Sequence, residues 1–371
     1  MIDPIVVIVG TRPGIIMMAP IIHELIRTET PHYVIHTGQH YSANMDSELF
    51  EDLSLTKPSF HLKNDKNATS HAEQTARMMI GCEAAFVERR PSLVLVNGDA
   101  NTNLAAALAA RKLGISLGHC EAGERSYDWR MPEEHNRRIM DHISELLFAT
   151  DAKAEKTLLG EKVPGEVFVT GNTIVDASIN HALIASEKSK ALDIVKVKPG
   201  EYIVMTSHRE ENVDDPRKLE MTLRGASKAA VQSGYDVLFL IHPRTKKNMK
   251  NFGLEELAAS LPRLIITDAL RYLDFMQLLT NSKMVLTDSG GVQQEAFIHK
   301  KQCVTMRDNT EWGQTIECKG NRLSGTDDPD KIATCVMEAL NEKNVDWSLV
   351  FGDGTASQKI VAHSLAYVNS L

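Results

Sequence analysis

The sequence predicts an α/β fold in which two doubly wound parallel sheets follow one another along the chain. Three observations lead to this prediction. Short apolar runs rich in β-branched residues, such as IVVIVG at 5–10, alternate with helical patterns. The alternation restarts near 202, and a chain of 371 residues is long for a single hydrophobic core. Because alternating strands and helices are typical of parallel sheets, two such series indicate two similar domains.

Each series is expected to contain several strands separated by helices. The strands of the first series are expected at 5–10, 33–38, 93–99, 115–123 and 167–172. Those of the second series are expected at 202–208, 237–243, 264–268, 283–291 and 302–308. Helical patterns include those over 15–27, 104–114 and about 175–196. Sheets of this kind bind ligands beyond the carboxyl ends of their strands, so the loops that follow the strands are the candidates for function.

Composition argues against several classes of protein. Acidic residues outnumber basic ones by 49 to 41, which argues against a nucleic-acid partner. No run approaches the roughly 18 apolar residues of a membrane span, and MIDPIVVIVGTRP at 1–13 lacks the basic start of a signal peptide. The five cysteines are odd in number and form no CxxC pair. They favour reduced thiols, a cytoplasmic location and no zinc site.

Two strand-to-helix turns are suited to an anionic ligand. The first, GTRPG at 10–14, combines glycines with an arginine, although it is not the GxGxxG pattern of a dinucleotide site. The second contains Ser289, Gly290 and Gly291, and Glu295 follows about one turn into the helix, within reach of a ribose. The alternatives are an ordinary turn in the first case and a helix start capped by Ser289 in the second.

Carboxylates gather at strand ends in the first series. Asp99 ends one strand, Glu121 follows the next, and Glu133 and Glu134 lie in MPEEHNRR at 131–138. Crowded carboxylates raise one another's pKa, which lets one of them act as a general acid near neutral pH. For Glu133 and Glu134 the alternative is the acidic first turn of a helix that starts at a proline.

Histidines follow two strands of the second series. SHREEN at 207–212 places His208 beside Arg209, and His242 takes the same position one strand later. A histidine and an arginine at a strand end are able to bind a phosphate or to protonate a leaving group. Cys120 adjoins a glutamate, but no neighbouring base activates it, and we interpret it as a buried thiol.

Seven motifs together resemble the non-hydrolysing UDP-N-acetylglucosamine (UDP-GlcNAc) 2-epimerase family. They follow one another in the family's order: GTRP at 10–13, NGD at 97–99, EAG at 121–123, PEEHNRR at 132–138, SHREEN at 207–212, TDSGGVQQE at 287–295 and RDNTEW at 307–312. The resemblance implies the GT-B fold, with two Rossmann-like domains facing a central cleft. It implies a domain of sugar contacts and catalytic carboxylates over 1–172, a UDP-binding domain over 173–355, and a helix over 356–371 that crosses back to the first domain.

The resemblance also implies a reaction that needs no metal and no nicotinamide cofactor. The hydrogen on C2 is removed and UDP leaves C1, which gives a 2-acetamidoglucal, and UDP adds back after reprotonation on the opposite face. The matched catalytic positions are Asp99, Glu121, Glu133 and His208. The matched substrate-binding positions are Arg12, Arg209, His242, Ser289, Gly290, Gly291, Glu295 and Arg307. A UDP-sugar is the implied partner, and a homodimer is the implied assembly.

Two departures from the family pattern keep other substrates and activities open. Gly14 and Met17 stand where bacterial members usually have Glu and Lys, and TEW at 310–312 replaces the commoner Thr-Glu-Arg-Pro. The alternatives are a 2-epimerase of UDP-2,3-diacetamido-glucuronic acid, a hydrolysing epimerase that releases free N-acetylmannosamine, a GT-B glycosyltransferase and a non-catalytic nucleotide-sugar binder. Gln39 and His40 fall in the segment that supplies an activator site in many bacterial members.

Overall fold

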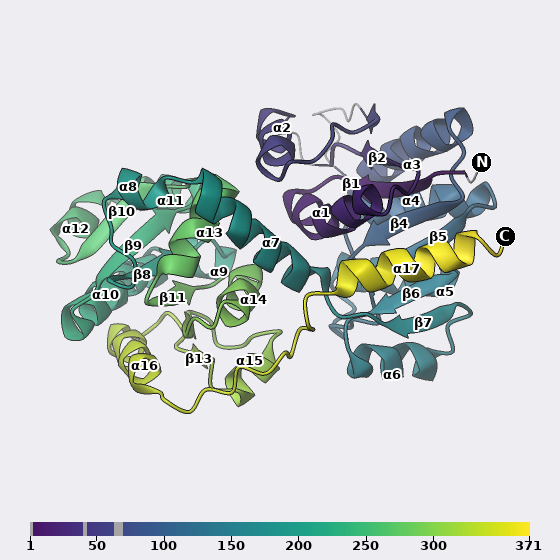
Figure 1. The fold of residues 1–371 in the computed structure, drawn as a ribbon. Coiled ribbons are helices and arrows are strands. Elements are labelled where there is room, and N and C mark those ends of the chain that lie inside the picture. Colours follow the sequence, from purple (N-terminus) through teal and green to yellow (C-terminus); the bar gives the residue numbers. More distant parts are fainter. Residues whose placement is uncertain (1–2, 40–42, 63–69) are drawn as a thin grey trace. The chain divides into compact units, whose positions relative to one another are not determined.

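The computed structural model describes residues 3–39, 43–62 and 70–371, without the side chains of 43–46. The chain divides into two compact units (Figure 1). Unit 1 comprises residues 1–180 together with 351–371, and unit 2 comprises residues 181–350. Each unit is built on a parallel sheet of its own, as the two series of strands predict.

The sheet of unit 1 has seven strands in the order β3-β2-β1-β4-β5-β6-β7, and all of its pairs are parallel. The strands are β1 (Ile5–Val9), β2 (His32–His36), β3 (Phe60–His61), β4 (Leu93–Asn97), β5 (Ser116–Ala122), β6 (Leu146–Ala149) and β7 (Glu166–Val169). Every residue of β1 and β4 is buried. Strands covered on both faces favour apolar residues at successive positions, which explains the continuous runs IVVIV in β1 and LVLV in β4.

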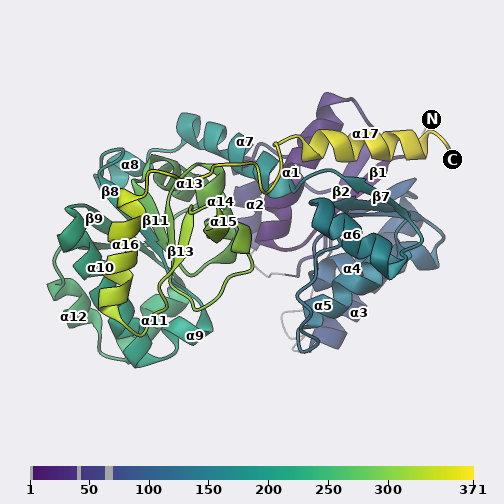
Figure 2. The ribbon, with the colours of Figure 1, turned by 90° about the horizontal axis from the view of Figure 1, so that it is seen from below.

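Seven helices of unit 1 accompany this sheet in the described part of the chain. They are α1 (Arg12–Arg27), α2 (Ala43–Asp52), α3 (His71–Glu88), α4 (Asn101–Lys112), α5 (Pro132–Ile143), α6 (Ala152–Glu161) and α17 (Ala356–Val368). Helix α17 packs beside α1, although more than 300 positions separate them (Figures 1 and 2). The buried carboxylate of Asp176 accepts hydrogen bonds from the backbone N–H of Ala356 (3.2 Å) and Ser357 (2.8 Å), which anchors the start of α17.

The sheet of unit 2 has six parallel strands in the order β10-β9-β8-β11-β12-β13. The strands are β8 (Tyr202–Thr206), β9 (Asp236–Ile241), β10 (Leu264–Asp268), β11 (Met284–Thr287), β12 (Cys303–Thr305) and β13 (Asn321–Leu323). The remaining helices are α7 (Thr173–Lys188), α8 (Ala191–Val195), α9 (Glu210–Val213), α10 (Pro216–Ser233), α11 (Pro243–Asn251), α12 (Glu255–Ser260), α13 (Tyr272–Asn281), α14 (Gly290–Ile298), α15 (Gly313–Glu317) and α16 (Pro329–Asn341). Helix α7 begins in unit 1 and ends in unit 2.

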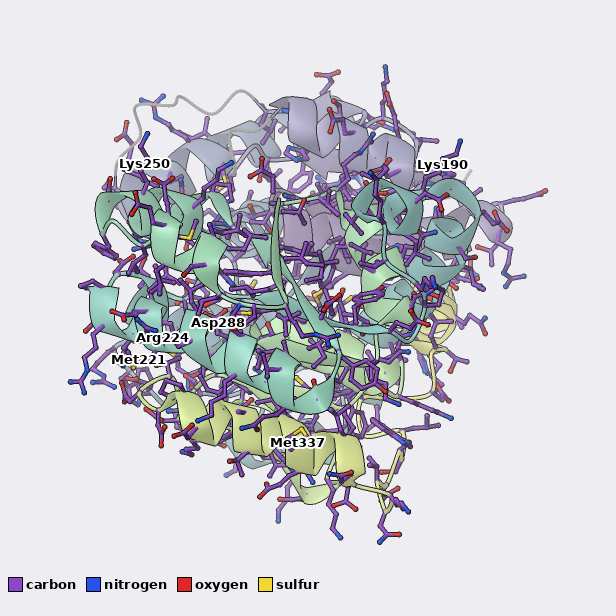
Figure 3. The ribbon with its side chains drawn as sticks, turned by 90° about the vertical axis from the view of Figure 1, so that its left-hand side faces the viewer. Lys190, Met221, Arg224, Lys250, Asp288 and Met337 are labelled. Carbon is purple, nitrogen blue, oxygen red and sulfur yellow. The ribbon has the colours of Figure 1, made fainter. Side chains whose placement is uncertain are left out.

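Helices α10 and α16 lie side by side on unit 2 (Figure 3). Their close approach depends on Gly225, because a Cβ atom there would lie 2.6 Å from Cδ1 of Ile332. Such a distance is shorter than atoms in a well-packed core tolerate.

Both sheets share one strand order around a switch point. From β1 the chain of unit 1 moves outward to β2 and β3, and it then returns to β4 on the other side of β1. Unit 2 repeats this path with β8, β9, β10 and β11. Loops after the two strands at such a switch point diverge and leave a crevice beyond the sheet edge. The sites to inspect are therefore the loops after β1 and β4 and those after β8 and β11.

Two helices differ from their predicted bounds. Helix α1 begins at Arg12 and not at 15, because Pro13 fits the first helical turn and Thr11 accepts a hydrogen bond from the N–H of Gly14 (3.2 Å). The helix predicted over about 175–196 is broken after Lys188. At the break, Ser189 accepts a hydrogen bond from the N–H of Ala191 (3.1 Å), a side-chain to backbone bond that competes with helix continuation.

The described residues include no helix that is both long and apolar enough to cross a membrane.

Candidate active site

The loop after β1 is held tightly against its neighbours in unit 1. A Cβ atom at Gly10 would overlap the hydroxyl oxygens of Thr37 and Thr102, which bond each other at 2.9 Å. Only glycine fits where the backbone passes so closely. Gln39 accepts hydrogen bonds from the backbone and the hydroxyl of Thr102 (2.8 and 2.7 Å), whereas His40 lies outside the described residues. Arg12, partly exposed, follows at the first position of α1.

The loop after β4 carries Asp99 at the same switch point. Gly98 takes a left-handed conformation with φ of 72°, which turns the chain at the end of the strand. The carboxylate of Asp99 forms an ion pair with Arg137 on α5. Asn136 donates to the backbone carbonyl of Asp99 at 2.8 Å. Helix α5 therefore fixes both the backbone and the side chain of this carboxylate.

Glu121 lies beside Asp99, on the neighbouring strand β5. Its φ is 64°, and the register of β5 against β6 shifts between Cys120 and Ala122. This bulge is a strained position for a residue with a side chain, and such positions often re-aim a side chain at a functional site. Asn172 donates a hydrogen bond to Oε1 of Glu121 at 3.2 Å. A Cβ atom added at Gly98 would lie 2.9 Å from Oε2 of Glu121, so this turn and the carboxyl are neighbours.

The environment of Glu121 favours its neutral form. Desolvation by burial, followed by the nearby charges of Asp99 and Glu124, raises the pKa of Glu121 from 4.5 to about 8. The hydrogen bond from Asn172 and the charge of Arg137 oppose this rise. Glu121 therefore keeps its proton at neutral pH, whereas Asp99 is paired with a guanidinium. Two neighbouring carboxyl groups in unlike environments are the usual arrangement for an acid and a base.

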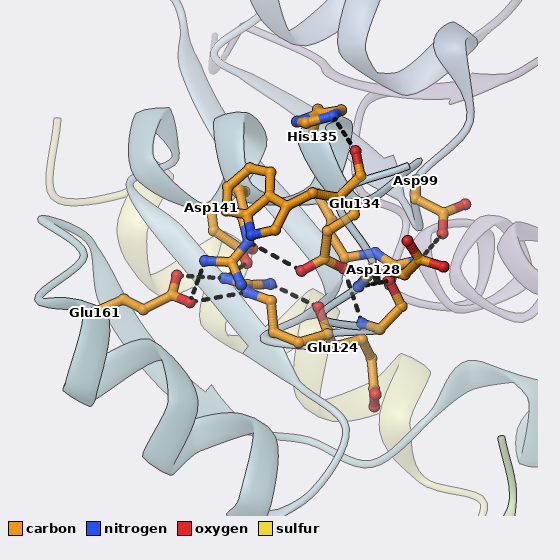
Figure 4. Close-up of polar contacts among 12 residues, drawn as sticks. Asp99, Glu124, Asp128, Glu134, His135, Asp141 and Glu161 are labelled. Carbon is orange, nitrogen blue, oxygen red and sulfur yellow. Dashed lines mark hydrogen bonds and ion pairs between the residues drawn. The ribbon is translucent and has the colours of Figure 1, made fainter. Parts of the chain in front are cut away.

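A network of ionic groups that includes Glu134, Asp141 and Glu161 lies near Asp99 (Figure 4). His119 bonds Asp141 through Nδ1 at 2.7 Å, and its Nε2 lies 3.2 Å from the carbonyl oxygen of Gly98. Arg125 pairs with Asp141 at 2.7 Å and with Glu161 at 2.8 Å. Because His119 touches the Gly98 turn, this network supports the backbone that presents Asp99.

Glu133 and Glu134 stand in the first turn of α5, which starts at Pro132. The alternative interpretation, the acidic first turn of a helix that starts at a proline, is therefore confirmed for the local structure of this motif. Glu134 is buried, accepts hydrogen bonds from Ser126 (2.8 and 2.9 Å) and pairs with Arg137 at 3.2 Å. Glu133 is partly exposed. Within the described part of the chain, no hydrogen bond or ion pair joins Glu133 to Asp99 or Glu121.

Asp288 organises the switch point of unit 2. Its side chain is fully buried at the end of β11. It accepts hydrogen bonds from the backbone N–H groups of His208 and Arg209 (3.0 Å each), from Ser207 Oγ (2.8 Å) and from Asn212 Nδ2 (3.1 Å). Nδ1 of His208 lies 3.2 Å from its Oδ1. One carboxylate therefore fixes the loop after β8 to the end of β11, and these donors hold its pKa below 3.8 despite burial.

Ser289, Gly290 and Gly291 form the start of α14. Ser289 occupies the N-cap position, as the alternative interpretation has it, but its side chain makes no capping hydrogen bond to any described residue. A Cβ atom at Gly291 would meet no described protein atom within 4 Å. Packing inside the described protein therefore gives no reason for glycine at 291, whereas close approach of a ligand to the helix start would.

Basic and imidazole groups surround this helix start. Arg307 forms hydrogen bonds to both oxygens of Glu311 (2.9 and 3.0 Å), and Arg209 lies 3.9 Å from the same carboxylate. His242 caps α11, and its ring centroid lies 5.5 Å from that of His208. Desolvation, followed by the charge of His208, lowers the pKa of His242.

Glu295 is buried on the second turn of α14. The hydroxyl of Tyr272 donates a hydrogen bond to its Oε1 at 3.1 Å. Burial raises the pKa of Glu295 to about 7, and the hydrogen bond from Tyr272 opposes this rise.

The candidate residues thus form one group in each unit. Unit 1 brings Asp99 and Glu121 together, and unit 2 brings together His208, Arg209, His242, Arg307 and the start of α14. Sequence reasoning missed the partners that hold them, namely Arg137, Asn172 and Asp288. The signals were present for Arg137 and Asp288, which lie inside motifs that the sequence analysis singled out, whereas Asn172 only ends the strand expected at 167–172. Cys120 is buried, and burial raises its pKa, as expected for an unreactive thiol. The described residues contain no group of three or more His, Cys, Asp or Glu arranged to hold a metal ion.

Known proteins resemble the chain over nearly its whole length. Residues 23–364 match the profile of the family described as UDP-N-acetylglucosamine 2-epimerase. A UDP-N-acetylglucosamine 2-epimerase of Methanococcus maripaludis is 42% identical over 96% of both chains. A UDP-2,3-diacetamido-2,3-dideoxy-D-glucuronate 2-epimerase of Pseudomonas aeruginosa is 35% identical over 97% of this chain and 98% of its own. The crystal structure of Methanocaldococcus jannaschii UDP-GlcNAc 2-epimerase with UDP-GlcNAc and UDP superposes with a TM-score of 0.83, at 41% identity and covering 98% and 99% of the two chains.

Proposed function

The chain belongs to the UDP-N-acetylglucosamine 2-epimerase family, and on this premise we propose that it interconverts UDP-GlcNAc and UDP-N-acetylmannosamine (UDP-ManNAc) without hydrolysing them. The observation that carries the proposal is the pair of carboxyl groups in unit 1. Glu121 holds a proton near neutral pH because of its environment, and Asp99 beside it is paired with Arg137. Inversion at C2 needs a group that removes a proton and a group that delivers one.

The proposed reaction proceeds through elimination and addition. A base removes the proton from C2, the C1–O bond breaks with its electrons going to UDP, and a C1=C2 double bond forms in 2-acetamidoglucal. Addition of UDP to C1 and of a proton to the opposite face of C2 gives the epimer. Glu121, protonated, and Asp99 are the proposed acid and base, and Glu133 is the third proposed carboxylate. Burial and the bulge at Glu121 support its part in proton transfer.

The leaving group requires neutralisation of a diphosphate. We assign this task to His208, Arg209, His242 and Arg307 with Arg12, because cationic and hydrogen-bonding groups at a leaving phosphate lower the barrier to its departure. The start of α14 at Ser289, Gly290 and Gly291 is the proposed diphosphate contact, since free N–H groups and the helix dipole favour an anion there. Glu295 is the proposed acceptor for the ribose hydroxyls.

These proposed contacts give each domain a separate role in the reaction. The catalytic carboxylates belong to the proposed domain 1–172, and the UDP contacts after β8 and β11 belong to the proposed domain 173–355. The helix 356–371 completes the first domain. Excluding water from the sugar would protect the glycal intermediate from side reactions.

A second candidate is epimerisation of a modified sugar. Gly14 and Met17 depart from the usual Glu and Lys, and a relative at 35% identity is described as acting on a diacetamido-glucuronate. Identity to the M. maripaludis UDP-GlcNAc 2-epimerase is higher, at 42%, which favours UDP-GlcNAc as the first substrate to test.

Proton NMR of the purified protein with UDP-GlcNAc in heavy water tests the proposal, with no metal or nucleotide cofactor added. Formation of UDP-ManNAc with deuterium at C2 is the expected result. Release of free N-acetylmannosamine would overturn it in favour of the hydrolysing reaction. An unchanged spectrum, followed by turnover of the diacetamido-glucuronate substrate, would overturn it in favour of the second candidate.

A further inference from the structure

Three buried polar side chains of unit 2 lie in a row that ends at Glu295. They are His181 on α7, Tyr272 on α13 and Glu295 on α14, and their exposed fractions are 0%, 7% and 6%. Nδ1 of His181 lies 3.3 Å from the Tyr272 hydroxyl, and this hydroxyl lies 3.1 Å from Oε1 of Glu295. The rings of His181 and Tyr272 meet edge to face, with centroids 5.5 Å apart.

The chemistry of the three groups fixes the direction of the hydrogen bonds. A tyrosine hydroxyl has one hydrogen to donate, and it also accepts. When the hydrogen of Tyr272 goes to the Glu295 carboxylate, the remaining partner, His181, must donate to the Tyr272 oxygen through Nδ1–H. This order satisfies the Tyr272 hydroxyl with one donor and one acceptor. It also uses one acceptor site of Oε1 of Glu295, so that Oε2 keeps its full acceptor capacity for a ligand.

We propose that Tyr272 is a positioning residue for nucleotide recognition, which holds the Glu295 carboxylate so that its second oxygen receives the ribose hydroxyls. The proposal rests on the proposed function, in which Glu295 is the ribose contact. His181 orients the Tyr272 hydroxyl by donating to it from α7. This makes three helices, and not α14 alone, responsible for the placement of one acceptor atom.

Packing alone does not explain a tyrosine at this position. A phenylalanine would keep the ring and its contact with His181, but it would leave a buried carboxylate without its donor. A buried charged group that loses its hydrogen-bonding partner is costly, and the carboxyl would then rotate or keep a proton. Either change weakens it as an acceptor for two hydroxyls. The tyrosine hydroxyl therefore acts on the ligand through Glu295.

The chain offers a matched control in Tyr202. It is also a buried tyrosine of unit 2, with 1% of its surface exposed, but its hydroxyl donates to the backbone carbonyl of Leu278 at 2.5 Å. Tyr272→Phe and Tyr202→Phe each remove one buried, hydrogen-bonded hydroxyl. Only the first removal touches a side chain proposed to contact the ligand.

The test is calorimetric binding of UDP, 2′-deoxy-UDP and 3′-deoxy-UDP to the full chain at pH 8. The readout is the ratio of the affinity for UDP to that for each deoxy analogue, because this ratio cancels changes in diphosphate binding. Tyr272→Phe is expected to lower the ratio by roughly tenfold for at least one analogue, because the loss of a hydrogen bond to a charged group typically lowers affinity by about this factor. Tyr202→Phe is expected to keep the wild-type ratio. A wild-type ratio in Tyr272→Phe would overturn the inference.

Two further variants separate this inference from the proposed function. If Glu295→Gln lowers the ratio and Tyr272→Phe does not, the ribose contact stands and only the positioning role fails. If wild-type protein binds no UDP, or if Glu295→Gln keeps the ratio, the proposed ribose contact itself is wrong. Should Tyr272→Phe fail to fold, His181 supplies the test. His181→Gln retains a donor and should keep the ratio, His181→Leu should lower it, and equal ratios in the two would overturn the inference.

Discussion

Replacing Glu121 by glutamine is expected to stabilise the protein at alkaline pH and to change its stability little at pH 5. Burial, followed by the charge of Asp99, raises the pKa of Glu121 from 4.5 to about 8 in the folded chain. A carboxyl whose folded pKa lies above its unfolded pKa contributes stability below the unfolded value and loses this contribution as the pH rises through the folded value. Wild-type stability therefore falls between pH 4.5 and about 8 because of this group, and glutamine, which does not ionise, avoids the loss.

The structure sets the size of this effect. Each pH unit between the folded and unfolded pKa corresponds to about 1.36 kcal/mol, so the interval from 4.5 to about 8 gives a ceiling of about 5 kcal/mol. Because Glu121 is partly exposed and solvent screens its charge, we expect about 2 kcal/mol at pH 8.5. Glutamine keeps an oxygen that accepts the hydrogen bond from Asn172, so the variant preserves the local packing.

Urea unfolding at pH 5, 7 and 8.5, followed by circular dichroism, measures this difference. The control is Glu83→Gln, on an exposed position of α3 in the same unit. We expect the free energy of unfolding of Glu121→Gln to exceed that of wild type by a margin that grows with pH, while the control follows wild type. A constant margin between pH 5 and 8.5 would refute the raised pKa and, with it, Glu121 as a proton donor.

Three other variants test the site and the fold. Asp99→Asn is expected to lower kcat by about a thousandfold with UDP affinity by calorimetry unchanged; a near-normal rate would remove Asp99 from the catalytic groups. Glu295→Gln is expected to weaken UDP binding about tenfold at pH 8 but less at pH 6, because Glu295, with a pKa of about 7, is ionised mainly at the higher pH. Equal losses of UDP affinity at both pH values would contradict this pKa. Gly225→Ala should destabilise the protein by about 1–3 kcal/mol in thermal unfolding, since the new Cβ meets Ile332. The control Gly160→Ala, with no described atom within 4 Å of its Cβ, should not destabilise it. Equal melting temperatures of the two variants would contradict the tight packing of α10 on α16.

The strands at the centre of each sheet were predictable because their burial on both faces dictates their sequences. The run at 5–10 has no other reason to be continuously apolar. The edge strands β3 and β13 and the interior strand β6 were missed, since runs of two to four residues carry no recognisable period. The break between α7 and α8 was missed because the Ser189 hydroxyl also donates to Asp274 and Gln277, which lie 85 and 88 positions further along the chain.

The candidate site also has residues that were predictable from the sequence and residues that were not. Asp99 was predictable because it follows a strand, and Glu121 because it lies near the end of the next one, at the bulge of β5, and strand ends lie along one edge of a parallel sheet. Their partners depend on tertiary structure. Arg137 pairs with Asp99 across 38 positions, and Asn172 bonds Glu121 across 51. No local pattern encodes such distances, so the environment that gives Glu121 its raised pKa could not be derived from the sequence.

The division of unit 1 into two separate stretches of sequence affects the order in which the two units are able to fold during synthesis. Unit 2 is continuous over 181–350, whereas unit 1 needs 351–371 as well as 1–180. During synthesis the ribosome therefore releases all of unit 2 before α17 becomes available to pack beside α1 and to receive the carboxylate of Asp176. The proposed nucleotide contacts are able to form on a nascent chain whose unit 1 is still incomplete. Unit 1 would thus be completed only when α17 docks.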